Sequence, residues 1–117
     1  DQLTEERYVY REPGSGTRMV MEKLLRQKNI TPDIAMELST NEAVKQAIMA
    51  GIGISLISSL SLVTELPMKK IAILDLEELP LATQWHLVFK KDKMLTPIIE
   101  NFLDFLTDQN VEQYLPE

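Results

Sequence analysis

The sequence predicts an α/β fold in which a mostly parallel sheet carries helices on both faces. Along the chain, apolar residues alternate in short segments, then recur at helical spacing, then alternate again. Short links that contain glycine, proline or helix-capping residues separate these segments. The segment 52–57 is apolar except at Gly53 and Ser55, which is typical of a strand covered on both faces and therefore of a parallel sheet.

The N-terminal part of the chain predicts a strand, a helix and a second strand. Arg7–Arg11 is rich in aromatic and β-branched residues, which indicates a strand. The helix predicted over 17–27 has one apolar side, and Ser15 or Thr17 can cap its start. In Ile34–Leu38 apolar residues stand at every second position, as in a half-buried strand.

A second helix is predicted next, and its start has the pattern of a capping box. Ser39 and Glu42 have the S-x-x-E spacing, in which a hydroxyl and a carboxylate each accept a backbone N–H. Val44 and Ala47 follow at helical spacing, and Gly51 suits the C-terminal end.

The C-terminal half predicts the same alternation. We expect a short helix started by Ser58 and Ser59 and ended by Pro67, strands at 71–76 and 84–90, a helix from Pro97 to about Gln109, and an acidic tail at 110–117. Trp85, Phe102 and Phe105 follow the periodicity of these elements, so we expect them in the core.

Composition excludes several classes of protein. With 117 residues, 44% of them hydrophobic, the chain can form one core. Its 18 acidic and 12 basic residues give a net charge of −6, so we expect no DNA binding by this segment alone. It has no cysteine, and no metal or cofactor site is predicted. The apolar runs are far shorter than the roughly 20 residues of a membrane helix, so we expect no membrane contact. The absence of cysteine fits a reduced cytosol, and we expect a cytoplasmic protein.

The sequence gives little support to catalysis. His86 is the only histidine, and no nucleophile motif stands near it. Neighbouring acids such as Glu77 and Glu78 point apart in a loop, and the lysines of 90–93 are predicted to form a solvated turn. We therefore expect no enzyme, since the glycine turn would need a positioned base to act as an oxyanion or phosphate site.

The turn before the first helix is the main candidate for a ligand site. It offers backbone N–H groups and the hydroxyls of Ser15 and Thr17 at a helix start, with Arg11 and Arg18 nearby. It lacks the lysine of a P-loop and the third glycine of a dinucleotide fingerprint, which disfavours nucleotides. The residues alone leave two interpretations open: a tight turn without a ligand, and a receptor for a small carboxylate or phosphate.

The start of the second helix offers a similar set of polar groups. Ser39, Thr40 and Asn41 can cap the helix, and ligand contact is a further possibility. In a parallel sheet both turns follow the C-terminal ends of strands, which is where such folds bind ligands.

Four segments together resemble the effector-binding domain of LysR-type transcriptional regulators. They are Arg-Glu-Pro-Gly-Ser-Gly-Thr-Arg at 11–18, Ser-Thr-Asn-Glu-Ala-Val-Lys at 39–45, Ala-Gly-Ile-Gly-Ile at 50–54, and Leu-Pro at 79–80 leading to Trp85. The first is similar to the corresponding segment of carbon-fixation operon regulators. The resemblance extends from Tyr8 to Leu106, nearly the whole chain.

The resemblance implies a periplasmic-binding-protein-like fold of type 2, with two α/β subdomains and an effector in the cleft between them. Residues 1–109 would be part of this domain, with 12–83 as the second subdomain, 84–109 as the returning strand and helix of the first, and 110–117 as the tail. The effector contacts that it implies in this chain are Gly14, Ser15, Gly16, Thr17, Ser39, Thr40 and Asn41. Arg11, whose guanidinium lies near the first turn, is added to this set from its chemistry.

The resemblance also implies the partners: a small anionic effector, a second copy of the protein, and DNA through an N-terminal winged helix-turn-helix that this chain lacks. We expect the dimer interface on the helix 17–27 and the strand 34–38. The alternative is a transport-type periplasmic solute-binding protein, which shares the fold and the cleft but would carry a secretion signal and a complete two-lobed chain.

Overall fold

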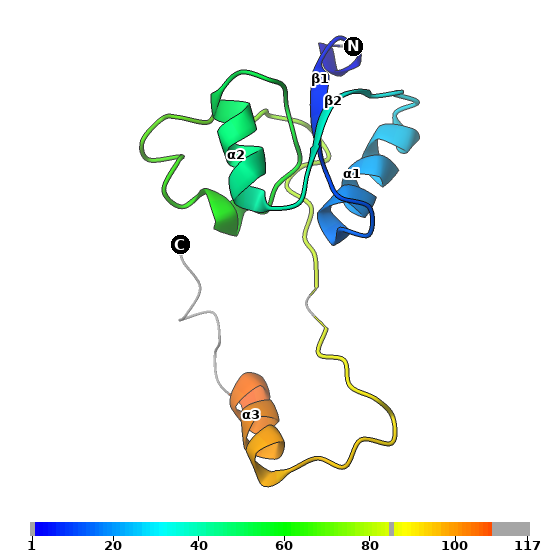
Figure 1. The fold of residues 1–117 in the computed structure, drawn as a ribbon, viewed down its shortest axis with the longest axis vertical. Coiled ribbons are helices and arrows are strands. Elements are labelled where there is room, and N and C mark those ends of the chain that lie inside the picture. Colours follow the sequence, from blue (N-terminus) through cyan, green and yellow to red (C-terminus); the bar gives the residue numbers. More distant parts are fainter. Residues whose placement is uncertain (1, 85, 109–117) are drawn as a thin grey trace. The chain divides into compact units, whose positions relative to one another are not determined.

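A computed structural model describes residues 2–84 and 86–108 of the chain (Figure 1). The chain divides into two compact units, the first ending at Ala72 and the second beginning at Ile73. The elements are the 3₁₀-helix η1 (Gln2–Thr4), strand β1 (Arg7–Arg11), helix α1 (Gly16–Gln27), strand β2 (Asp33–Leu38), helix α2 (Asn41–Met49), the 3₁₀-helix η2 (Ser59–Leu62) and helix α3 (Pro97–Asp108).

The sheet of the first unit is parallel, with β1 at its centre. β1 and β2 pair in register from Arg7 with Asp33 to Arg11 with Leu38, with one irregularity after Tyr8. Ile54 also pairs with β1, because its N–H donates to the Arg7 carbonyl at 2.9 Å and its carbonyl accepts the Val9 N–H at 2.9 Å. β1 is thus hydrogen-bonded to two other segments of the chain.

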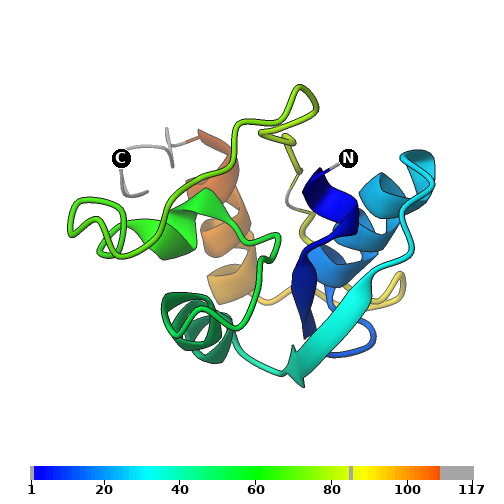
Figure 2. The ribbon, with the colours of Figure 1, turned by 90° about the horizontal axis from the view of Figure 1, so that it is seen from above.

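Helices cover both faces of this sheet, as the sequence predicted. Successive residues of a strand point to opposite faces. Tyr8 and Tyr10 accordingly pack with Met21 and Leu25 of α1, whereas Val9 packs with Val44 and Ala47 of α2. Figures 1 and 2 show α1 and α2 on opposite sides of the two strands. The order β1-α1-β2-α2 and the mostly parallel α/β class are confirmed.

The predicted strand at 52–57 is much shorter than expected. Only Ile54 forms a bridge, with Tyr8. The helix predicted after Ser58 is also shorter: η2 is one 3₁₀ turn, followed by a turn in which the Leu66 N–H donates to the Leu62 carbonyl at 3.1 Å. The Ser58 side chain makes no capping bond there, which removes one support for a longer helix.

The strands predicted at 71–76 and 84–90 are wrong for the described residues, which form no strand there. A strand needs a neighbour for its backbone groups, and alternating side chains alone cannot supply one. Several apolar residues of these segments are exposed instead, among them Ile73 at 64% and Val88 at 86%. Trp85, which was expected in the core, lies outside the described residues.

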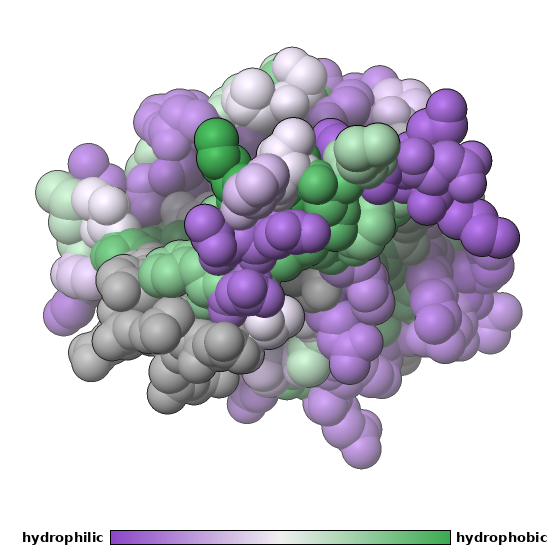
Figure 3. Space-filling model, turned by 90° about the horizontal axis from the view of Figure 1, so that it is seen from below, coloured by the Kyte–Doolittle hydropathy of each residue, from purple (hydrophilic) through white to green (hydrophobic). Residues whose placement is uncertain are grey.

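In the second unit, α3 begins at Pro97 as predicted. Its apolar stripe is not core: Ile98, Phe102 and Phe105 are 81%, 53% and 44% exposed. Helical periodicity identified the apolar face of α3 correctly, but no described element of this unit buries it. The space-filling view in Figure 3 shows hydrophobic residues, in green, at the surface of the face seen from below. Gln109, the expected end of this helix, and the tail at 110–117 lie outside the described residues.

Candidate functional site

The two turns singled out in the sequence meet at one edge of the sheet. Arg11 and Leu38 are the last paired residues of β1 and β2, and the Glu12 N–H donates to the Leu38 carbonyl at 3.0 Å. α1 begins at Gly16 and α2 at Asn41, shortly after these strand ends. Both helices therefore start from the C-terminal edge of the sheet, below the strands in Figure 1. This is the edge at which open α/β sheets bind ligands.

The first turn is built by one glycine and one serine. Gly14 has φ +90°, a left-handed conformation that glycine adopts without steric cost. Ser15 is the N-cap of α1, since its hydroxyl accepts the Arg18 N–H at 3.4 Å. Of the two candidate caps, Ser15 therefore takes the role. The N–H groups of Gly16 and Thr17 have no acceptor within the helix and face its N-terminal end.

At the second turn the predicted capping box is wrong. The N-cap of α2 is Thr40, whose hydroxyl accepts the Ala43 N–H at 3.1 Å. A capping box needs an acid at the third helical position, and here that position is Ala43. Glu42 lies one residue earlier, and its carboxylate binds Lys45 at 2.8 Å. Ser39 lies before the cap and is exposed.

Arg11 links the two turns. Its guanidinium donates to both carboxylate oxygens of Glu12, at 2.8 and 3.0 Å, and to the side-chain oxygen of Asn41. This hydrogen bonding holds the pKa of Glu12 below its ordinary value and raises that of Arg11. The Asn41 side-chain nitrogen donates onward to the Ser61 hydroxyl at 3.1 Å. Sequence reasoning missed Ser61, because nothing in its local pattern indicates a contact twenty residues away.

Arg18 braces the first turn rather than facing outward. Its guanidinium binds Glu22 at 2.8 Å and Glu37 at 2.6 Å and donates to the Arg11 carbonyl at 2.9 Å. It also lies 5.2 Å from the centroid of the Tyr10 ring. The bonds to the two glutamates raise the pKa of Arg18. Both arginines of the site are thus paired with carboxylates, so the backbone N–H groups and hydroxyls carry much of its capacity for an anion.

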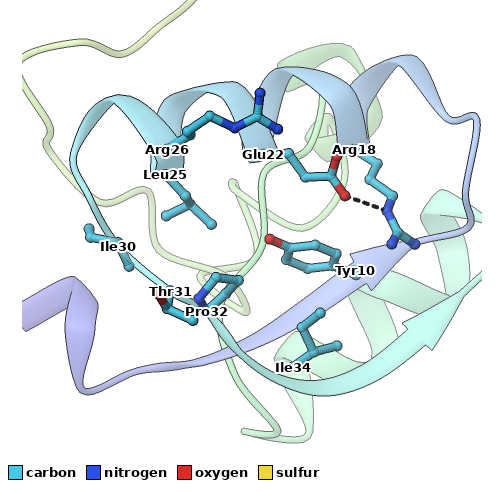
Figure 4. A pocket seen from close by; sticks show the side chains of 9 residues that line it. All are labelled: Tyr10, Arg18, Glu22, Leu25, Arg26, Ile30, Thr31, Pro32 and Ile34. Atoms are coloured by element: carbon cyan, nitrogen blue, oxygen red, sulfur yellow. Dashed lines mark hydrogen bonds and ion pairs between the residues drawn. The ribbon is translucent and has the colours of Figure 1, made fainter.

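An open pocket of about 300 Å³ lies beside this site, between α1 and β2 (Figure 4). The Arg18–Glu22 ion pair forms part of its wall. Its lining is otherwise largely apolar and comes from Tyr10, Leu25, Arg26, Ile30, Thr31, Pro32 and Ile34. The pocket shares only Arg18 with the turn region, and it contains none of the eight predicted effector contacts.

Within residues 2–84 and 86–108, no group of three or more histidine, cysteine, aspartate or glutamate side chains could hold a metal ion. In the same part of the chain no helix is long and apolar enough to cross a membrane. The arrangement at the sheet edge is therefore one of hydrogen-bond donors and paired charges.

Comparison with known proteins gives the family. A model of the LysR substrate binding domain matches residues 1–110. The chain belongs to this family. It is 44% identical over 104 residues to the HTH-type transcriptional regulator CbbR of Rhodospirillum rubrum, covering 89% of this chain and 35% of that protein. It is 38% identical over 107 residues to the RuBisCO operon transcriptional regulator of Allochromatium vinosum, covering 92% of this chain and 35% of that protein.

A solved structure agrees with the fold. The Synechocystis PCC6803 CcmR regulatory domain in complex with 2-PG matches with a TM-score of 0.83 at 37% identity, over 92% of this chain and 51% of that chain. The predicted resemblance to LysR-type and carbon-fixation regulators and the periplasmic-binding-protein-like fold are confirmed. The chain spans about a third of the length of the curated relatives. These relatives are transcriptional regulators, so they give no support to the transport-type alternative.

Proposed function

We propose that this chain is the second half of the effector-binding domain of a bacterial LysR-type transcriptional regulator, and that it binds a small anionic effector at the C-terminal edge of the β1-β2 sheet. The observation that carries the proposal is the register of the two strands. Because Arg11 pairs with Leu38, the N-terminal ends of α1 and α2 lie at one edge. Helix N-termini favour anions through free N–H groups and the helix dipole.

The donors for such an anion come from both helix starts. The N–H groups of Gly16 and Thr17 in α1 and of Asn41 in α2 have no acceptor within their helices. The other proposed contacts are Arg11 and the residues around the two caps: Gly14, Ser15, Ser39 and Thr40. The structure of the CcmR regulatory domain, which is similar to this chain, is a complex with 2-PG. We take 2-phosphoglycolate as the probe for this site because it is small and anionic.

The proposed mechanism is regulation and not catalysis. In the complete domain, the effector would lie between this half and the other subdomain and favour one arrangement of the two. That shift would change how the DNA-binding regions of a homo-oligomer, in the cytoplasm, meet their operator. DNA contact belongs to a winged helix-turn-helix elsewhere in the protein, because this chain carries a net charge of −6.

The test is a calorimetric titration of the full-length protein with 2-phosphoglycolate. Ser15→Ala and Thr40→Ala remove the two capping hydroxyls, and each should weaken binding about threefold to tenfold, the usual effect of losing one hydrogen bond. Thr107→Ala is the matched control, since its hydroxyl bonds only to carbonyls within α3. Affinity unchanged in both site variants would remove these turns from the effector site.

A further inference from the structure

Two polar contacts join α2 to the segment that contains η2. Asn41 donates to the Ser61 hydroxyl at 3.1 Å, and the Lys45 ammonium binds the Glu65 carboxylate at 2.7 Å. Asn41 and Lys45 are four residues apart and therefore lie on one face of α2. Ser61 and Glu65 are also four residues apart. The segment 61–65 thus lies against the N-terminal half of α2.

This contact is shielded from solvent. The side chains of Lys45 and Glu65 are only 12% and 11% exposed, and Leu62, between the two contacts, is 4% exposed. One Glu65 carboxylate oxygen is buried without a hydrogen-bond partner among the described residues. A buried, ion-paired contact restricts the segment far more than a solvated surface pair does. The Ser61 hydroxyl is therefore held in a defined place.

The Asn41 amide is fixed by what it contacts on each side. Its oxygen accepts from Arg11, which can only donate, so its nitrogen faces Ser61 and the Ser61 oxygen accepts. Turning the amide over would set its NH₂ group against the guanidinium. Asn41 therefore has its polar side-chain atoms engaged within the protein.

Arg11 keeps donors for a ligand in this arrangement. A guanidinium has five N–H groups, and three of its bonds in the structure go to Glu12 and Asn41. The guanidinium therefore has two further N–H groups that these three bonds do not use. Glu12 and Asn41 together orient the guanidinium, and Ser61 holds Asn41 on its other side.

We infer that Ser61 is a positioning residue of the effector site: it orients the Arg11 guanidinium through Asn41, so that η2 belongs to the site although it supplies no ligand contact. This inference rests on the proposed function. It also makes the side chain of Asn41, which was predicted from the sequence to be an effector contact, a link between Ser61 and Arg11, while its backbone N–H remains a proposed donor.

Titration of the full-length protein with 2-phosphoglycolate tests this role. Ser61→Ala should weaken binding about threefold to tenfold, the effect expected when one hydrogen bond is lost. Ser61→Thr keeps the hydroxyl and should restore affinity to within about twofold of the wild type. Ser58→Ala is the matched control and should bind like the wild type, because the Ser58 side chain makes no capping bond and is exposed.

A double-mutant cycle separates positioning from direct contact. If Ser61 acts only through Asn41, the double variant Asn41→Ala with Ser61→Ala binds as Asn41→Ala alone does. Independent, additive losses would overturn the positioning role, and so would a Ser61→Ala variant that melts earlier but binds normally. If the wild type binds neither 2-phosphoglycolate nor inorganic phosphate, the proposed function fails and this inference fails with it. Normal wild-type binding with no effect of Ser61→Ala overturns this inference alone.

Discussion

Gly53 lies directly against the backbone of Arg7. A Cβ atom at position 53 would come within 2.3 Å of the Arg7 carbonyl oxygen and 2.9 Å of its carbonyl carbon. The same Arg7 carbonyl accepts the Ile54 N–H at 2.9 Å. The absence of a side chain at Gly53 thus allows the segment around Ile54 to bind β1 and extend the sheet beyond its two strands.

Gly53→Ala should therefore destabilise the first unit. The added methyl cannot be accommodated without moving the segment away from β1, and overpacking of this kind costs about 1–3 kcal/mol. Urea denaturation measures the loss. Gly16→Ala is the control, because a Cβ there meets nothing within 4 Å. Equal stability of the two variants would show that the close contact at Gly53 does not matter.

Lysine should not preserve the stability that Arg18 gives to the first turn. Its planar group binds Glu22, Glu37 and the Arg11 carbonyl together, whereas an ammonium group cannot reach all three while lying over an aromatic ring. We expect Arg18→Lys to lower the free energy of unfolding, mainly through lost hydrogen bonds.

Arg26→Lys is the matched control for that variant, since Arg26 is exposed two turns further along the same helix. In urea denaturation, Arg18→Lys should unfold at a lower urea concentration than Arg26→Lys. Overlapping curves would mean that Arg18 does not brace the turn.

The Lys45–Glu65 pair predicts a specific dependence of stability on pH. The hydrogen bond from Lys45 lowers the pKa of Glu65 below 4.5. The stabilisation is therefore fully present above pH 4.5 and is lost as the pH falls through the lowered pKa. Conversely, the hydrogen bonds to Glu42 and then to Glu65 raise the pKa of Lys45 above 10.5, so the contribution of Lys45 is present below pH 10.5 and is lost as the pH rises through the raised pKa.

Glu65→Gln should accordingly melt earlier than the wild type at pH 7, and the difference should shrink as the pH falls below 4.5. Thermal melting across this range measures it. Glu5→Gln, at an exposed carboxylate, should show no such convergence. A difference between Glu65→Gln and the wild type that is constant from pH 7 to pH 3 would rule out the ion pair as its cause.

Local sequence patterns predicted β1, α1, β2 and α2 because tertiary contacts agree with them there. Tyr8 and Tyr10 alternate with Val9, and helices bury both sets. The same kind of alternation at 84–90 produced no strand in the described residues, since strand formation depends on a neighbour that a pattern does not supply. Val88, in that segment, is 86% exposed.

The candidate site was partly predictable for a similar reason. Its two turns follow from topology, because parallel strands place the helix starts at one edge. The roles of individual residues depended on packing. Thr40, and not Ser39, caps α2, and Ser61 accepts a hydrogen bond from Asn41, which lies twenty residues earlier. Hydroxyl residues near a helix start compete for the cap, and the backbone path decides between them.

The most direct test of anion binding at this edge is a titration of Thr17→Glu with 2-phosphoglycolate. Position 17 is the second residue of α1. A glutamate there favours the helix through its dipole, so stability should hold. Its charge would, however, lie beside the bound anion, where repulsion costs about 1–4 kcal/mol.

We predict that Thr17→Glu melts no earlier than the wild type and binds 2-phosphoglycolate at least about fivefold more weakly. Thr107→Glu, the same substitution at an exposed position of α3, should bind normally. Binding by Thr17→Glu within about twofold of the wild type would contradict the presence of an anion site at the start of α1.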